Sequence, residues 1–131
     1  MPDPDQDLEL LRELYREWEA GNLSAGRKLL SDELVTVWPE GFPHAGTYRG
    51  PEEHRRAMRE WLSAWTEFEL VAEDFVRVGE RIVVPFRVRA RGAGSGVEVN
   101  RRWAHAWTLS AGKVTRFEVS LEPDQLLEEP S

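Results

Sequence analysis

The spacing of apolar residues changes along the chain from a helical period to a strand period near residue 68. Asp3, Pro4 and Gln6 resemble a capping box, with Pro4 at the first helical position. Apolar side chains then recur at the i, i+3, i+4, i+7 spacing of one helix face, at Leu8, Leu11, Leu14, Tyr15 and Trp18. The pattern predicts a helix that ends at Gly21, followed by a short second helix over residues 22–30.

A second block predicts one strand, one loop and one further helix. The strand is "ELVTVWP", which stops at Pro39, and the glycines and prolines of "EGFPHAGTYRG" predict a loop. Pro51 opens the third helix, with Glu52 and Glu53 in the first turn, where acidic residues favour the helix dipole. Its apolar stripe is formed by Met58, Trp61, Leu62 and Trp65.

From residue 68 onward apolar and polar residues alternate, which is typical of strands. The predicted strands cover about 68–78, 81–91, 97–109 and 113–121. A tight turn at 79–80, the flexible segment 92–96 and a three-residue turn at 110–112 connect them, and Pro123 starts a short last helix. Helices precede strands in blocks, so we expect an α+β fold in which a curved, mainly antiparallel sheet wraps over three helices as a cone with an open mouth.

Composition narrows the class of protein. The length of 131 residues fits one domain over 1–131, and the net charge of −7 argues against nucleic acid or an anionic membrane as a partner. There is no cysteine, His44 and His54 lack metal-ligand spacing, and no nucleotide-binding glycine motif is present, so neither a metal nor a cofactor is expected. The acidic start lacks a signal-peptide pattern and no stretch could span a bilayer, so we expect a cytoplasmic protein.

The predicted strand 97–109 holds the candidate chemistry. Its odd positions form the apolar face and are Val97, Val99, Arg101, Trp103, His105, Trp107 and Leu109. Arg101 and His105 are the two ionisable members of this face, so both should project toward the concave side of the sheet. Histidine there can act as a general base or donate to a carbonyl, or it can be a core residue bonded to a backbone carbonyl or to Tyr15.

Three segments together resemble the SnoaL-like branch of the nuclear transport factor 2-like superfamily. They are "YREWEAGN", "YRGPEEHRRAMREW" and "WAHAWTLSAGKVTRFEVSLEPDQLL", and the resemblance extends over essentially the whole chain. It implies a cone-shaped half-barrel with an internal pocket and a homodimer joined through the convex sheet face. The superfamily includes polyketide cyclases, ketosteroid isomerases and epoxide hydrolases, so the site must decide the function.

The resemblance also implies what is missing. In cyclases of this family, a histidine matching His105 works with an aspartate that matches Val119 here, and valine cannot abstract a proton. Glu118 and Ser120 have the opposite parity and should point outward. We therefore expect a protein that binds a small apolar or aromatic molecule. The alternatives are an isomerase or polyketide cyclase-type enzyme with His105 as catalytic acid/base, and a non-catalytic dimerisation or interaction module.

The predicted pocket is lined by aromatic residues. A tyrosine on the first helix donates to a ligand oxygen in the isomerases this chain resembles, whereas core packing is the alternative for Tyr15. Arg101 either extends from the rim into water or binds a ligand carboxylate. The predicted ligand-binding residues are Tyr15, Trp18, Trp38, Trp61, Trp65, Phe86, Arg101, Trp103, Trp107 and Val119.

The outward arginines Arg87, Arg89 and Arg91 have two interpretations. They could pair with acidic residues of a dimer partner, or form cross-strand pairs on a solvated sheet face.

Overall fold

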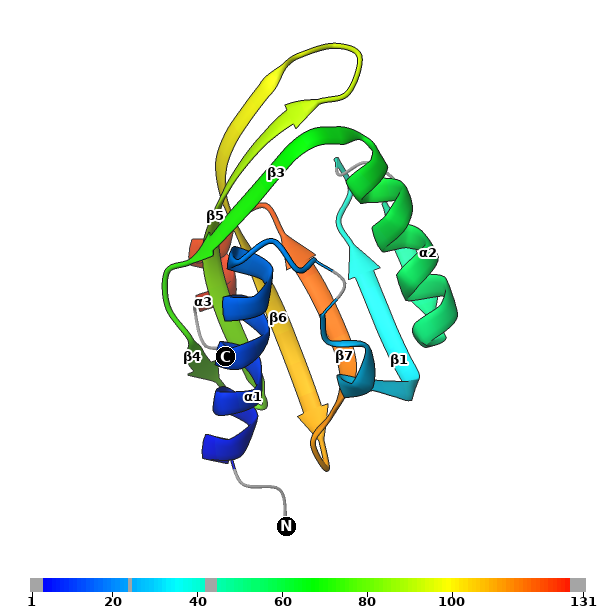
Figure 1. Ribbon diagram of the computed structural model, residues 1–131. Helices are drawn as coiled ribbons and strands as arrows, with labels where there is room; N and C mark the ends of the chain where they lie inside the picture. The colour runs from blue at the N-terminus through cyan, green and yellow to red at the C-terminus, as the bar shows by residue number, and fades with distance from the viewer. Residues whose placement is uncertain (1–3, 24, 42–44, 128–131) are drawn as a thin grey trace.

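The computed structural model describes residues 4–23, 25–41 and 45–127, which form helices in front of a curved sheet (Figure 1). The helical elements are α1 (Pro4–Glu19), the short 3₁₀ helix η1 (Arg27–Leu29), α2 (Gly50–Ser63) and α3 (Pro123–Leu127). The strands are β1 (Leu30–Trp38), β2 (Gly46–Arg49), β3 (Trp65–Ala72), β4 (Val76–Val78), β5 (Arg81–Gly92), β6 (Glu98–Ser110) and β7 (Lys113–Ser120). The predicted cap at Asp3 lies outside the described residues.

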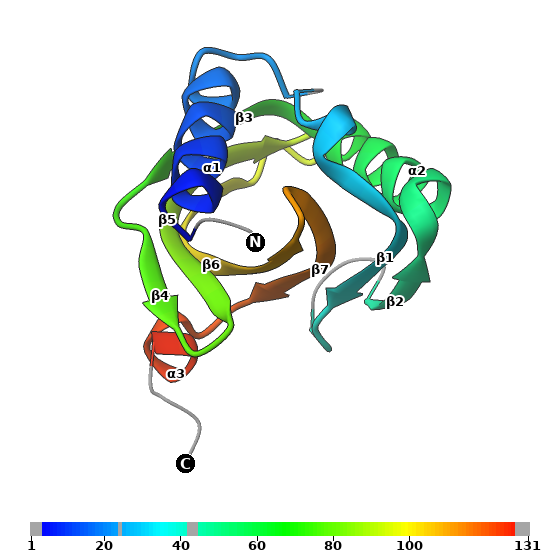
Figure 2. The same ribbon diagram turned by 90° about the horizontal axis from the view of Figure 1, so that it is seen from below.

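All strands belong to one seven-stranded sheet in the order β2-β1-β7-β6-β5-β3, with β4 also paired to β5. Every pairing is antiparallel except that of β1 with β7. Figure 2 shows the sheet curving around an interior, with α1 and α2 on opposite sides of the opening. The α+β cone predicted from the sequence is confirmed. Within the described part of the chain, no helix is both long and apolar enough to cross a membrane.

The two faces of the sheet carry different cores. The larger cluster lies between the concave face and helices α1 and α2, and it includes Leu11, Tyr15, Trp61 and Phe86. On the convex face, α3 covers a smaller patch in which Leu126 and Leu127 pack against buried side chains of β4, β5 and β6 (Figure 2). The concave cluster is therefore the part of the core that shapes a site.

Strand β6 places His105 on the concave face of the sheet. His105 is 7% exposed and pairs in register with Val84 on one side and Val119 on the other, and both valines belong to the concave core. Glu118, one residue away, lies on the convex face, where it pairs with Arg81 at 3.9 Å. Side-chain parity therefore places the imidazole inside the cone, beside a valine.

The helix expected over 22–30 is wrong, because η1 is the only helical element among the described residues of this range. Gly26, just before η1, has φ +102°, a left-handed conformation that ends regular helix and favours glycine. A Cβ at this position would also come within 2.7 Å of Leu14 Cδ1. The segment therefore crosses α1 at close range instead of forming a helix of its own.

The strand expected over 68–78 is also wrong, since it is divided into β3 and β4. Their neighbour β5 contains Pro85, whose carbonyl accepts a hydrogen bond from Glu73 N at 2.8 Å. Proline has no N–H to donate toward the same side, so the ladder cannot continue past this residue. The chain leaves the sheet after Ala72 and re-enters it at Val76.

Two boundaries were placed incorrectly for a common reason. Trp65 begins β3 rather than ending the stripe of the preceding helix, and β2 lies inside the predicted loop. Both segments are short and flanked by glycine or by a helix end, so their local pattern resembles a connection. Long-range pairing decides their conformation: Thr36 pairs with Tyr48, and Trp65 pairs with Gly92.

Two of the three outward arginines of β5, Arg87 and Arg91, make ion pairs within the chain. Arg87 pairs with Glu73 at 3.2 Å, and Arg91 pairs with Glu98 at 2.8 Å. Arg102 of β6 also donates to Glu73, and these two arginines hold the pKa of that carboxyl below its usual range. Of the two interpretations of these arginines, pairing within the sheet surface of one chain agrees with Arg87 and Arg91.

The β6–β7 turn differs from the three-residue turn predicted at 110–112. Ser110 pairs directly with Lys113, which leaves Ala111 and Gly112 as the two turn residues, with φ values of 52° and 77°. Two-residue hairpin turns of this kind need positive φ at both positions. Gly112 adopts it without strain, whereas Ala111 does so at a steric cost.

We expect Ala111→Asn to raise the free energy of unfolding by about 1 kcal/mol, because asparagine tolerates the left-handed conformation better than alanine. Urea denaturation of the two proteins measures this difference. Ala93→Asn, in the exposed 92–96 segment, is the control and should leave stability nearly unchanged. An Ala111→Asn protein no more stable than the parent would contradict the assignment of this turn.

Candidate functional site

The centre of the cone contains a chain of hydrogen bonds between Tyr15, His105 and Trp107. The indole N–H of Trp107 donates to the hydroxyl oxygen of Tyr15 at 2.8 Å. The same oxygen lies 2.6 Å from His105 Nδ1. Tyr15 comes from α1 and the other two from β6, so these bonds join the helix to the sheet. The Tyr15–His105 contact was one of the alternatives that the sequence left open.

The network assigns the tautomer of His105. An indole N–H can only donate, so the Tyr15 oxygen accepts from Trp107 and has its own hydrogen left to donate. The acceptor beside it is His105 Nδ1. The ring proton of a neutral His105 therefore sits on Nε2, which is the nitrogen that Tyr15 does not occupy.

Both histidines of the interior are held in the neutral state. Burial, with the nearby His54 as the second cause, lowers the pKa of His105 to about 3. Burial, with Arg55 as the second cause, lowers the pKa of His54 to about 4. Burial also raises the pKa of Tyr15 well above its ordinary value, although the hydrogen bond from Trp107 opposes this. No member of this group carries a charge at neutral pH.

His105 is also fixed by aromatic packing. Its ring stacks on Phe86 of β5 with centroids 4.2 Å apart. On the other side of β6, the ring centroid of Phe117 in β7 lies 4.8 Å from that of His105. These contacts leave the ring little freedom to rotate. A histidine with such a low pKa is a weak base, so its position suits hydrogen bonding better than proton abstraction.

The interior contains two adjacent spaces. The outer pocket has a volume of about 440 Å³ and opens between α1, η1 and α2. The inner chamber, deeper in the cone, has a volume of about 40 Å³ and includes His105 and Val119 in its walls. Five side chains line both spaces, namely Trp18, Leu23, Met58, Leu62 and Phe117.

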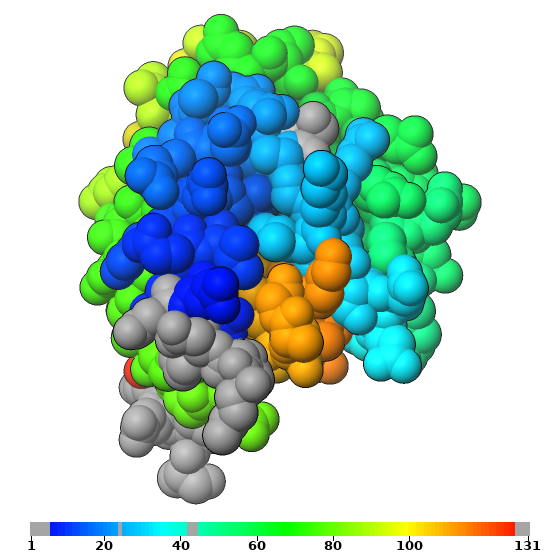
Figure 3. Space-filling view, turned by 60° about the horizontal axis from the view of Figure 1, so that its bottom comes forward, coloured from blue at the N-terminus to red at the C-terminus, as the bar shows by residue number. Residues whose placement is uncertain are grey.

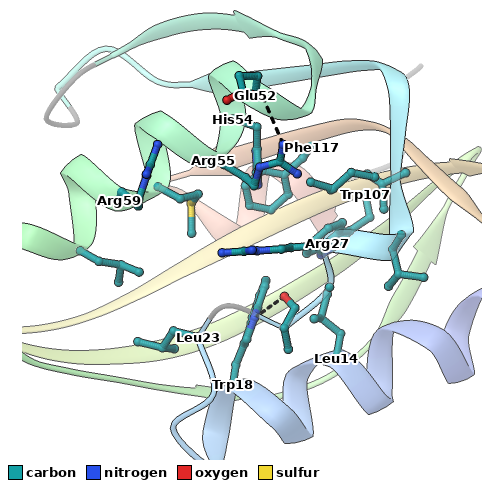
Figure 4. A pocket seen from close by; sticks show the side chains of 17 residues that line it. Leu14, Trp18, Leu23, Arg27, Glu52, His54, Arg55, Arg59, Trp107 and Phe117 are labelled. Carbon is teal, nitrogen blue, oxygen red and sulfur yellow. Dashed lines mark hydrogen bonds and ion pairs between the residues drawn. The ribbon is translucent and has the colours of Figure 1, made fainter.

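The outer pocket is lined by segments that are far apart in the sequence. Figure 3 shows α1 (blue) and the η1–β1 segment (cyan) beside the β6–β7 turn (orange) at the open end of the cone. The close view shows Trp18 on one wall and His54, Arg55 and Arg59 of α2 on the other, with Arg27 reaching between them (Figure 4). Trp18 is fixed by donating from Nε1 to the carbonyl of Ala25 at 3.3 Å.

The predicted ligand-binding residues separate into three groups. Those that line the inner chamber are Trp18, Trp38, Trp61, Phe86, Trp103 and Val119. Trp18 and Trp107 line the outer pocket. Tyr15, Trp65 and Arg101 line neither space: Tyr15 acts through its hydrogen bonds, and Trp65 packs on Trp61 with ring centroids 5.1 Å apart.

Arg101 lies outside the pocket. Its side chain is exposed, and Nη1 donates to the carbonyl of the neighbouring Asn100 at 3.2 Å. Of the two alternatives for this residue, the rim position agrees with the structure.

Sequence reasoning missed part of the outer pocket. His54 was not among the predicted ligand-binding residues, but it is partly buried, lines the pocket and lies 2.8 Å from Thr36 Oγ1 through Nδ1. Arg55, Met58, Arg59 and Leu62 also line it. The i, i+3, i+4, i+7 spacing of these four residues on one helix face was the available signal. His44 lies outside the described residues. Among those described, no three histidine or acidic side chains come together as a metal site.

The chain belongs to the SnoaL-like domain family. The family model matches residues 11–117, which include α1 from Leu11 onward, both pocket walls and the Tyr15–His105–Trp107 network. A search of the curated proteins found no significant match.

Solved structures give the same fold at low identity. An NTF2-like protein from Burkholderia thailandensis has a TM-score of 0.79 and 22% identity, covering 99% of this chain and 100% of its own. A protein described as a SnoaL-like polyketide cyclase from Jannaschia sp. has a TM-score of 0.77 and 19% identity, with coverages of 97% and 94%. TerC, crystallised with polyporic acid, has a TM-score of 0.74 and 20% identity, with coverages of 92% and 94%.

The neutral histidines predict that the protein loses stability as the pH falls. Below pH ~6.5 the unfolded chain binds protons at His54 and His105 that the folded chain does not bind, so unfolding becomes easier. Between pH ~7.5 and ~5.5, above the range in which carboxylates titrate, each histidine should cost about 1.4 kcal/mol. Urea denaturation across this range measures the loss.

His105→Gln should remove about half of this pH dependence because it removes one of the two titrating rings. Phe86→Leu perturbs the same packing but keeps the imidazole, so it should lower stability equally at all pH values. An unchanged slope in His105→Gln would contradict the buried, neutral state of His105.

Proposed function

We propose that the protein binds a small, flat apolar or aromatic molecule in the outer pocket. The observation that carries the proposal is an opening of about 440 Å³ with Trp18, Met58 and Phe117 in its walls. Pockets for small ligands range from about 300 to 1,000 Å³ and have mostly apolar walls with a few polar groups. TerC, which shares the fold, was crystallised with polyporic acid, and this supports a small-molecule ligand.

The inner chamber limits how deeply the ligand can enter. Its volume of about 40 Å³ is far below the roughly 150 Å³ of a cavity that holds benzene, so it cannot accept a ring without side-chain movement. The body of the ligand therefore lies in the outer pocket, and only a small substituent reaches the chamber. His105 Nε2–H is the polar group available to such a substituent, because Tyr15 occupies Nδ1.

An isomerase or polyketide cyclase activity with His105 as general base has less support. Its low pKa makes the imidazole a weak proton acceptor. Val119 stands directly across from it in register, and no carboxylate lines the inner chamber among the described residues. Glu52, the acidic residue in the outer pocket, pairs with Arg55 at 3.4 Å. These observations favour binding over proton abstraction.

The homodimer through the convex face stays a prediction. Besides its ion pairs, the convex face presents the side chain of Val71 in β3, which is apolar and 53% exposed.

Ligand binding is tested by tryptophan emission and thermal stability with a panel of naphthalene-sized aromatic compounds. We expect bound compounds to quench emission, since Trp18 lines both spaces, and to raise the melting temperature. Ala25→Phe adds a ring at the pocket wall and should weaken binding by about tenfold or more through lost space.

Ala93→Phe is the matched control, because Ala93 is exposed in the loop between β5 and β6, and it should bind as the parent does. The proposal fails if the whole panel leaves both emission and melting temperature unchanged. It also fails if Ala25→Phe binds the compounds as tightly as the parent.

A further inference from the structure

The mouth of the outer pocket has a charge opposite to that of the whole protein. The chain has a net charge of −7, yet the ionisable residues with permanent charge around this pocket are Arg27, Arg55, Arg59 and Glu52. Three cations against one anion leave the rim with a local charge of about +2. A positive rim on a protein of net negative charge calls for an explanation in the residues around the pocket.

Intramolecular ion pairing explains only part of this rim. Glu52 pairs with Arg55 at 3.4 Å, but its side chain is 79% exposed and it reaches one arginine alone. Within residues 4–23, 25–41 and 45–127, neither Arg27 nor Arg59 has an acidic partner within ion-pair distance. The convex arginines Arg87 and Arg91, in contrast, are paired with glutamates.

The arrangement of the arginines costs stability. Arg55 and Arg59 are four residues apart on one helix face, where like charges repel. Arg27 adds a third positive charge from the opposite wall, reaching across the mouth between Trp18 and α2 (Figure 4). Its backbone is held in place by the left-handed Gly26 before it and by Lys113, whose ammonium donates to the carbonyl of Lys28. The fold therefore fixes the backbone from which the Arg27 side chain extends toward the mouth.

We propose that the ligand of the outer pocket is an organic anion whose carboxylate binds the guanidinium groups of Arg27 and Arg59. This inference rests on the proposed function, since it adds a charged end to the flat apolar body bound between Trp18 and Met58. Guanidinium binds carboxylate with two parallel hydrogen bonds, and the apolar wall beside these arginines strengthens the attraction by excluding water. The carboxylate stays at the mouth and the rings point inward.

The test compares two probes of nearly equal shape, 2-naphthoate and its neutral amide, 2-naphthamide, by calorimetry. We expect the parent protein to bind the carboxylate at least about tenfold more tightly than the amide at low salt. The ratio should fall toward one in the double variant Arg27→Gln/Arg59→Gln. It should also fall when the salt concentration rises from ~0.05 to ~0.5 M, because exposed charges are screened.

Arg89→Gln is the matched control. It removes one positive charge from the convex face, where Arg89 is exposed and outside the outer pocket, and it should leave the ratio unchanged. Equal binding of both probes to the parent protein would overturn the carboxylate site while leaving apolar binding intact. A ratio that persists in the double variant would also overturn it. Binding of neither probe would contradict the proposed function itself.

Discussion

The hydroxyl of Tyr15 is the contact on which the site depends. It accepts from Trp107 and donates to His105, so one side chain of α1 satisfies two buried polar groups of β6. A buried polar group without a partner costs about 1–3 kcal/mol, so the helix can dock on the sheet in few other ways. Docking in this way places Trp18, one turn further along α1, against both the outer pocket and the inner chamber.

The interior around His105 is neutral, whereas the mouth of the outer pocket is charged. His105 is neutral because it is buried, and its ring lies against Phe86 and Phe117 in a chamber that Val119 also lines. The permanent charges lie at the mouth, on α2 and η1. A ligand that fits both regions has an apolar body and a polar end. General-base chemistry would require a side chain in the apolar part that accepts a proton. His105 is poorly suited to this because its pKa is low.

The sequence predicted the fold and the face of the sheet on which the histidine lies, because period-two alternation over a long strand such as β6 leaves one consistent register. It could not locate the outer pocket. The arginines at positions 55 and 59 look like an ordinary solvated helix face, and only the approach of η1 and α1 from the other side makes them a pocket wall. The sequence also could not predict the volume of the inner chamber, about 40 Å³, because that volume depends on how the aromatic rings pack against one another.

The local errors have a similar origin. The break at Pro85 and the edge strand β2 are decided by pairing between separate segments, which local propensity does not contain. The turn at Ala111 depends on the register of the β6–β7 hairpin. The resemblance to SnoaL-like proteins gave the overall fold, whereas the replacement of the family's acid by Val119 gave the expectation of weak or absent proton-transfer chemistry. The register of β6 with β7 places that valine opposite His105.

The state of the His105 ring is the most direct test of this account. Nitrogen-15 NMR of the protein labelled at histidine reports which ring nitrogen carries a proton and whether the ring is charged. We predict a neutral ring at pH ~7 with the proton on Nε2 and a bare, hydrogen-bonded Nδ1, and no protonation down to pH ~5. In Tyr15→Phe the Nδ1 signal should shift as it loses its donor. A charged imidazole at pH ~6, or a proton on Nδ1, would contradict the account.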